Sequence, residues 1–209
     1  MGKAYNELAG RSRDRLAALS DGIFAVAMTL LVLDLHIPVS DKIRTEHDLW
    51  TALLPLSGTF LAYFMSFLTL GIFWLAQQAQ LNFLARSDRN VTWIHIGFLL
   101  FVALMPGSTA LLAAFIGFRI ALIGYWLNIV VLGALLFVGW EYAKRARILK
   151  DDLPDGVDAA IRRRIFVAQG LYALGAALCV FNTYWSIAFI VLVQLNYVIA
   201  PRVRWLHQL

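Results

Sequence analysis

The sequence predicts an all-α membrane protein with six transmembrane helices, and two features carry that prediction. First, 61% of its 209 residues are hydrophobic, whereas a soluble domain is roughly half apolar. Second, the apolar residues form blocks of about twenty, which is the length that a helix needs to cross a bilayer. The predicted spans form one transmembrane domain over residues 1–209. They cover residues 15–37, 51–80, 91–115, 119–143, 163–181 and 183–201.

Polar residues and short loops refine these spans. The second span is long and ends in a glutamine-rich stretch around Gln77 and Gln78, so it either projects beyond the bilayer or faces protein. Few residues separate the third span from the fourth, or the fifth from the sixth. Each of these pairs is therefore predicted to form a tight antiparallel hairpin. Pro106 predicts a break or a bend within the third span.

The basic residues predict the orientation. If both termini are cytoplasmic, 15 of the 18 lysines and arginines fall in cytoplasmic segments, and only Lys42, Arg44 and Arg119 lie outside. Such an excess of positive charge marks the cytoplasmic side of membrane proteins. We therefore expect a multi-pass protein of the cell membrane with both termini inside.

Several classes of function are disfavoured. The histidines are scattered and the single cysteine, Cys179, lies in an apolar run, so neither a metal site, a cofactor nor an enzyme active site is predicted. The basic residues lie between apolar blocks rather than along one face, which argues against a nucleic-acid partner. The sequence also lacks the TVGYG filter of common potassium channels. The predicted partners are the lipid bilayer and further copies of the same chain.

The first span carries two aligned rows of residues. Ile23, Ala27, Leu30 and Asp34 follow helical spacing. If several copies of the span surround an axis, Ile23 and Leu30 form apolar rings that gate water and ions, and Asp34 forms a negative ring at the outer mouth. The alternative is that Ile23 and Leu30 are ordinary lipid-facing or core residues. The second row has small side chains, which let helices approach closely; it consists of Ala18, Gly22, Ala25 and Thr29.

The same span begins with a cluster of polar residues. Arg15, Ser20 and Asp21 lie within two helical turns. One interpretation is a helix cap together with an arginine at the cytoplasmic boundary. The other is a buried polar network that fixes the first span against its neighbours. Its candidate partners are Trp74, Gln77, Gln78 and His95.

The residues of the first three spans resemble a known family. Arg15-Leu-Ala-Ala-Leu-Ser20-Asp21 is similar to the Arg-x-x-x-Phe-Ser-Asp signature of the transmembrane protein 175 family of potassium channels. The apolar run that follows Asp21, the stretch Gly71-Ile-Phe-Trp74 and the run that ends at Pro106 also look like that family. The six-span layout matches the prokaryotic form, which has a single repeat.

The resemblance implies a homotetramer with the first span around a central pore. It places Ile23 at the narrowest apolar constriction, with Ala27 and Leu30 as further layers. It also implies that Arg15, Ser20, Asp21 and Trp74 organise the helices rather than contact the permeant potassium ions.

This sequence departs from the family pattern at several positions. Leu19 replaces the phenylalanine of the signature, and Gln77 and Gln78 stand in a region where histidine is frequent. His95 stands where asparagine is frequent, and Val26 where relatives carry a hydroxyl that assists selectivity. The predicted function is therefore a potassium-permeable cation channel in which the apolar constriction is a gate and a weak selectivity element. A secondary or proton-coupled membrane transporter is the alternative.

Overall fold

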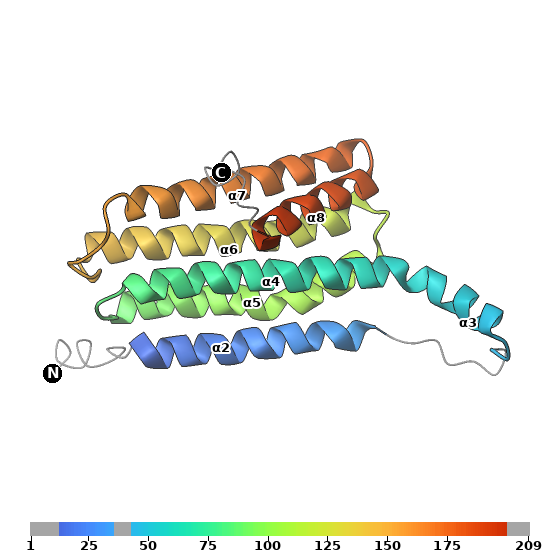
Figure 1. Cartoon of the computed structure of the whole chain (residues 1–209), viewed down its shortest axis with the longest axis horizontal. Coiled ribbons are helices and arrows are strands. Elements are labelled where there is room, and N and C mark those ends of the chain that lie inside the picture. The colour runs from blue at the N-terminus through green and yellow to red at the C-terminus, as the bar shows by residue number, and fades with distance from the viewer. Residues whose placement is uncertain (1–12, 36–42, 200–209) are drawn as a thin grey trace.

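The computed structural model describes residues 13–35 and 43–199 and is all-helical within them. Five helical segments are long and apolar enough to cross a membrane, and the sixth, α8, is apolar but has only 17 residues. The predicted fold class, an all-helical membrane protein with six helices, is confirmed (Figure 1). In chain order the elements are α2 (Arg13–Leu30), η1 (Leu31–Asp34), α3 (Glu46–Leu53), η2 (Leu54–Leu56), α4 (Ser57–Phe83), α5 (Arg89–Ala114), α6 (Arg119–Arg145), α7 (Val157–Ala177), η3 (Leu178–Val180) and α8 (Thr183–Ile199).

The helical segment that contains the second predicted span begins before it. A helical segment runs from Glu46 to Phe83, because α3 and η2 precede α4 without a loop. Thr45 starts this segment with a capping box, in which its hydroxyl accepts from the Asp48 amide and the Asp48 carboxylate accepts from the Thr45 amide. These reciprocal bonds satisfy amides that have no partner within the helix. Figure 1 shows α3 projecting beyond the bundle.

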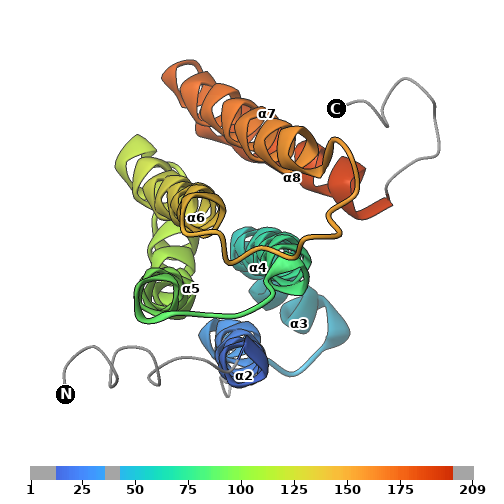
Figure 2. The ribbon, with the colours of Figure 1, turned by 90° about the vertical axis from the view of Figure 1, so that its left-hand side faces the viewer.

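The helices pack around α4. It contacts α2, α5, α6 and α8, while α5 packs on α6 and α7 packs on α8 as the two predicted hairpins. Figure 2 shows the bundle from one end, with α2 at its edge and α7 and α8 on the opposite side of α4. Among the long helices of the described residues, α2 packs mainly on α4 and α5, so the described part of the chain leaves one of its faces uncovered.

Helix α5 continues through Pro106, so the helix does not break there, and a bend at this residue stays a prediction. A proline removes one backbone hydrogen bond from a helix. In the same region the Asn128 side chain, from α6, donates to the carbonyl oxygen of Phe101 at 3.3 Å. This contact links α6 to α5.

One end of the bundle is tied together by its loops. We call it the Arg13 end, because α2 begins there, and the opposite end the Leu30 end. The loop after α4 pairs with the loop after α6: the Lys150 amide donates to Phe83 O and the Ala85 amide donates to Ile148 O, both at 2.9 Å. Arg13 donates to Leu84 O at 3.3 Å. The start of α2 is therefore joined to both loops.

Candidate functional site

The uncovered face of α2 is the first candidate site. Successive helical residues are rotated by about 100°, and this rotation divides the uncovered face into two adjoining flanks. The apolar flank consists of Leu19, Ile23, Val26 and Leu30. The small flank consists of Ala18, Gly22, Ala25 and Thr29, all exposed in the single chain.

The apolar flank borders a groove between α2 and α5. The groove has a volume of about 420 Å³, and Ala103 of α5 forms part of its opposite wall. Val26 is 57% exposed and Leu30 is 42% exposed, whereas Ile23 is half-buried against the core. Leaving such apolar side chains uncovered is characteristic of surfaces that meet lipid, another protein or a pore.

Ala27 and Asp34, which also belong to the predicted pore, do not lie on either exposed flank. Ala27 is 1% exposed and belongs to the hydrophobic core of the single chain. It also lines the groove that the apolar flank borders, together with Ile23 and Leu30, and its place as a layer of the constriction stays a prediction. Asp34, the predicted mouth residue, ends η1, and its side chain lies outside the described residues.

Gly22 stands at the middle of the uncovered face. A methyl group built on its Cα would meet no atom of the chain within 4 Å. Packing within the chain therefore does not require glycine at this position. A small residue with open space around it is what a close contact with a second helix needs.

The polar residues of α2 form the second candidate site, and they do meet α4. One carboxylate oxygen of Asp21, Oδ1, accepts from Trp74 Nε1 at 2.8 Å and from Gln78 Nε2 at 2.7 Å. Ser20 is fully buried; its hydroxyl accepts from Gln77 Nε2 at 3.0 Å and donates to Leu16 O. Hydrogen bonds to a charged group are stronger than those between neutral groups. These bonds link two consecutive residues of α2 to three residues of α4.

Two other members of the predicted network lie differently. His95 is buried in α5, where its Nδ1 lies 2.9 Å from Val91 O and its ring faces Gly139 of α6. None of the contacts described joins it to Ser20 or Asp21. Arg15 is exposed near the Arg13 end and has an interaction partner.

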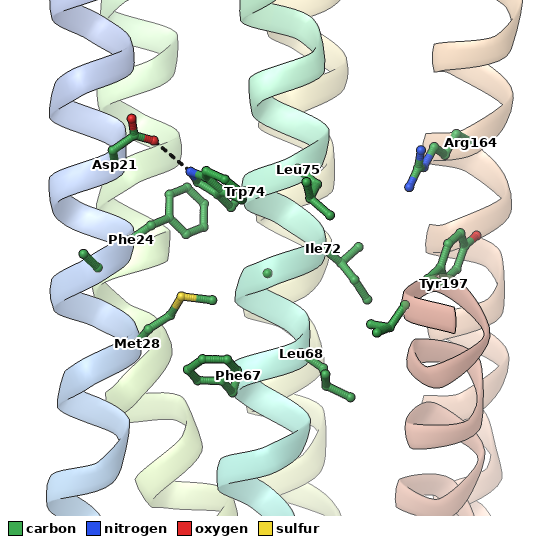
Figure 3. Close-up of a pocket in the computed structure, with 13 residues that line it drawn as sticks. Asp21, Phe24, Met28, Phe67, Leu68, Ile72, Trp74, Leu75, Arg164 and Tyr197 are labelled. Carbon is green, nitrogen blue, oxygen red and sulfur yellow. Dashed lines mark hydrogen bonds between the residues drawn. The ribbon is translucent and has the colours of Figure 1, made fainter. Parts of the chain in front are cut away.

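A second groove lies on the other side of this polar contact. It has a volume of about 530 Å³ and lies between α2, α4 and the pair α7 and α8. Figure 3 shows Asp21 and Trp74 at its α2 side, Arg164 and Tyr197 at its α7 and α8 side, and apolar side chains of α4 between them. Its walls are largely apolar, so most of its surface offers no polar partner to a ligand.

A buried polar cluster in the centre of the bundle was not predicted. Thr109 donates to Ser66 at 2.7 Å, and Gln194 donates to Thr69 at 2.6 Å. The Tyr125 hydroxyl lies 3.0 Å from Thr69 Oγ1 and accepts from Ser66 at 3.3 Å. The signal for this cluster was present in the sequence, because polar side chains within apolar spans require partners. The cluster joins four helices, α4, α5, α6 and α8.

Comparison with known proteins identifies the family. The family model described as endosomal/lysosomal potassium channel TMEM175 matches residues 15–106. A potassium channel of Streptomyces collinus is 33% identical over 170 residues, covering 79% of this chain and 80% of the relative. This chain belongs to the TMEM175 family. The resemblance drawn from its sequence is therefore confirmed, and the family is one of ion channels rather than enzymes.

Two further similarities extend over most of the chain. A potassium channel of Chamaesiphon minutus is 29% identical over 177 residues, covering 83% of this chain and 87% of the relative. The crystal structure of a lysosomal potassium-selective channel TMEM175 homolog from Chamaesiphon minutus has a TM-score of 0.78 and 26% identity. It covers 91% of this chain and 98% of that chain. The whole helical bundle is thus the TMEM175 fold.

Proposed function

We propose that this protein is a potassium-permeable cation channel of the cell membrane, formed by four copies of the chain with α2 around the central pore. The observation that carries the proposal is the uncovered face of α2, which has an apolar flank beside a flank of small residues. Family membership supports the permeant ion, since bacterial relatives are named potassium channels.

The two flanks suit two different neighbours. The small flank allows another α2 to approach closely, with Gly22 at the point of contact. The apolar flank then faces the axis, where Ile23 and Leu30 supply apolar rings. Such rings oppose the passage of hydrated ions and can close by dewetting. Ala27, which lines the same groove as Ile23 and Leu30, supplies a further layer, and Asp34 supplies negative charge at the mouth.

The polar contacts between α2 and α4 have a supporting role in this proposal. A helix that lines a pore must keep a fixed rotation about its own axis. A rotation by one residue, about 100°, would bring different side chains to face the pore. The bonds from Trp74, Gln77 and Gln78 to α2 fix that rotation. The charge distribution supports cytoplasmic termini, since the Arg13 end contains Arg13, Arg15, Arg86, Arg89, Lys144, Arg145, Arg147 and Lys150.

The deciding experiment measures ion flux through purified protein in liposomes, with potassium and sodium gradients. The wild-type channel is expected to dissipate a potassium gradient passively and without saturation. A secondary or proton-coupled transporter would instead saturate, or would require a proton gradient.

The constriction is tested by Ile23→Asn. An amide in the ring wets the constriction, so conductance should rise and the preference for potassium over sodium should fall. Leu30→Asn should act in the same direction but less, because its layer is expected to be wider. Leu192→Asn, at a 64% exposed position of α8, is the matched control and should leave both properties unchanged. An Ile23→Asn tetramer with wild-type conductance and reversal potential would remove Ile23 from the proposed pore.

A further inference from the structure

The groove between α2, α4 and the pair α7 and α8 carries a charged side chain on each of two opposite walls. Figure 3 shows Asp21 on the α2 wall and Arg164 on the α7 wall, with apolar side chains of α4 between them. The α4 lining extends from Phe67 to Leu75, which is about 12 Å at 1.5 Å per residue. Arg164 lies at the Leu75 end of this lining (Figure 3), so a long apolar surface ends beside a cation.

The apolar side chains along this groove are open to their surroundings in the single chain. Leu75 is 57% exposed and Val198 is 54% exposed. Because α4 belongs to a helical segment long and apolar enough to cross a membrane, the groove faces hydrocarbon rather than water within a bilayer. An acyl chain suits such a groove, since it needs no polar partner from the walls.

Arg164 has no acidic partner, although a neighbouring arginine does. Arg162 pairs with Glu141 at 3.1 Å. Within residues 13–35 and 43–199, none of the ion pairs or hydrogen bonds involves Arg164; its guanidinium carbon lies 5.9 Å from the centre of the Tyr197 ring. The Asp21 carboxylate accepts its bonds from α4 instead. Arg164 is exposed, so an anion from outside the chain can reach it.

The depth of Arg164 indicates which anion is available. Trp140 of α6 donates to Asp158, near the start of α7, at 2.9 Å, and tryptophans commonly mark the membrane interface. Arg164 follows Asp158 by six residues, which places it about 9 Å closer to the Leu30 end. A charge at that depth is costly without a counter-ion, and a long arginine side chain can reach back to the interface. The anions of the interface are lipid phosphates.

We propose that this groove binds one anionic phospholipid from the leaflet at the Arg13 end. The lipid phosphate pairs with Arg164, and one acyl chain lies along α4 against Leu68, Ile72 and Leu75. A guanidinium group matches phosphate because it offers two parallel hydrogen bonds, and basic pockets between transmembrane helices bind lipid headgroups. The lipid site is independent of ion conduction, because it requires only that the helices span a bilayer.

Native mass spectrometry of the purified protein tests the headgroup contact. Phosphatidylglycerol is the anionic probe, and phosphatidylcholine with the same acyl chains is the zwitterionic one. The wild type is expected to bind phosphatidylglycerol about fivefold more tightly, which is the advantage that one arginine gives near a membrane surface. Arg164→Gln should abolish this preference. Arg163→Gln is the matched control, because Arg163 is also exposed but does not line the groove. The same preference in Arg164→Gln as in the wild type would overturn the proposal.

The acyl-chain contact is tested by narrowing the groove. Val198→Trp adds a large side chain at an exposed lining position and should weaken the binding of both lipids. Leu192→Trp, at an exposed position of α8 outside the groove, should bind both lipids as the wild type does. Unchanged lipid binding by Val198→Trp would contradict the site. A Val198→Trp protein that keeps its lipid but separates into smaller species would show that a neighbouring subunit fills the groove, which would also overturn the proposal.

Discussion

At the scale of single residues, Asp21 has the most consequential contacts. Two donors from α4 converge on one of its oxygens, and the preceding residue, Ser20, adds a buried bond to the same helix. The carboxylate does not line the groove beside the apolar flank, which holds Ile23 and Leu30. We therefore expect the carboxylate to stabilise the contact between α2 and α4 rather than to bind permeating ions.

Replacing Asp21 separates these two roles. Asp21→Ala leaves Trp74 Nε1 and Gln78 Nε2 without their acceptor, so we expect the free energy of unfolding to fall by about 1–2 kcal/mol. This figure is small for a charged acceptor because the carboxylate is exposed in the single chain. Asp21→Asn keeps an acceptor oxygen and should lose less. Thermal unfolding in detergent measures both effects. A stable, assembled Asp21→Ala channel with altered ion preference would instead place this carboxylate on the ion path.

At the scale of helices, the hairpin of α7 and α8 depends on one glycine. A methyl group added at Gly175 would lie 2.8 Å from Ile190 Cγ1 and 3.1 Å from Phe189 Cδ1. Ser186 of α8 also donates to the Gly175 carbonyl oxygen. The backbones therefore approach as closely as small residues allow.

Alanine substitutions on α7 test this contact. Gly175→Ala overpacks the hairpin and should lower the stability by about 1–3 kcal/mol. Gly170→Ala lies on the same helix with no atom within 4 Å of the added methyl group, so it should be neutral or stabilising. Equal melting temperatures for the two variants would show that the hairpin adjusts without cost.

The loop after α6 offers a test of how α2 is held. Lys150→Pro removes the amide that donates to Phe83 O, whereas Lys150→Ala removes the charge and keeps that bond. Because Arg13 of α2 donates to the adjoining Leu84, the proline should loosen the start of α2 and change the open probability in single-channel recordings. The alanine variant should behave as wild type. Identical recordings for both variants would mean that this loop is not coupled to α2.

The helices were largely predictable because bilayer thickness imposes a length on apolar segments. The segment 46–50 was missed because it is polar at its start and lies outside an apolar block, although Thr45 and Asp48 form a capping pair that marks a helix start. The burial of Ala27 in the single chain has a geometric cause. Ala27 and Leu30 lie about 60° apart around the helix. The boundary between the face that α4 and α5 cover and the uncovered face of α2 falls between them. Spacing within one helix cannot locate that boundary, since it depends on where α4 and α5 pack.

The partners of the polar residues were predictable only in part. Trp74, Gln77 and Gln78 follow one another at helical spacing on α4, so proximity to Ser20 and Asp21 required only that the two helices pack side by side. The position of His95 depends on the rotation of α5, which the sequence does not specify. For the central cluster, the sequence shows that Ser66, Thr69 and Gln194 need partners, but only the packing of the bundle decides that they satisfy one another.

At the scale of the whole molecule, one helix of the single chain has a face without a packing partner among the described residues. Helix α2 lies at the edge of the bundle (Figure 2), and no helix within residues 13–35 and 43–199 covers its two flanks. A closed ring of identical subunits would cover the small flank and enclose the apolar one, and a repeated head-to-tail contact forms such a ring when its rotation closes. The proposed tetramer is therefore also the state in which the small flank is packed against a neighbouring helix and the apolar flank is shielded from lipid.

Gly22 gives this proposal its sharpest test. Gly22→Leu has space for its side chain in the single chain, so the subunit should still fold, yet the side chain would keep neighbouring α2 helices apart. We expect the tetramer to give way to smaller species in native mass spectrometry, with loss of potassium flux. Gly170→Leu is the matched control, because Gly170 is also exposed with nothing within 4 Å and α7 lies across the bundle from α2 (Figure 2). A Gly22→Leu protein that stays tetrameric and conducts normally, or a wild-type monomer that conducts, would show that α2 does not form the interface.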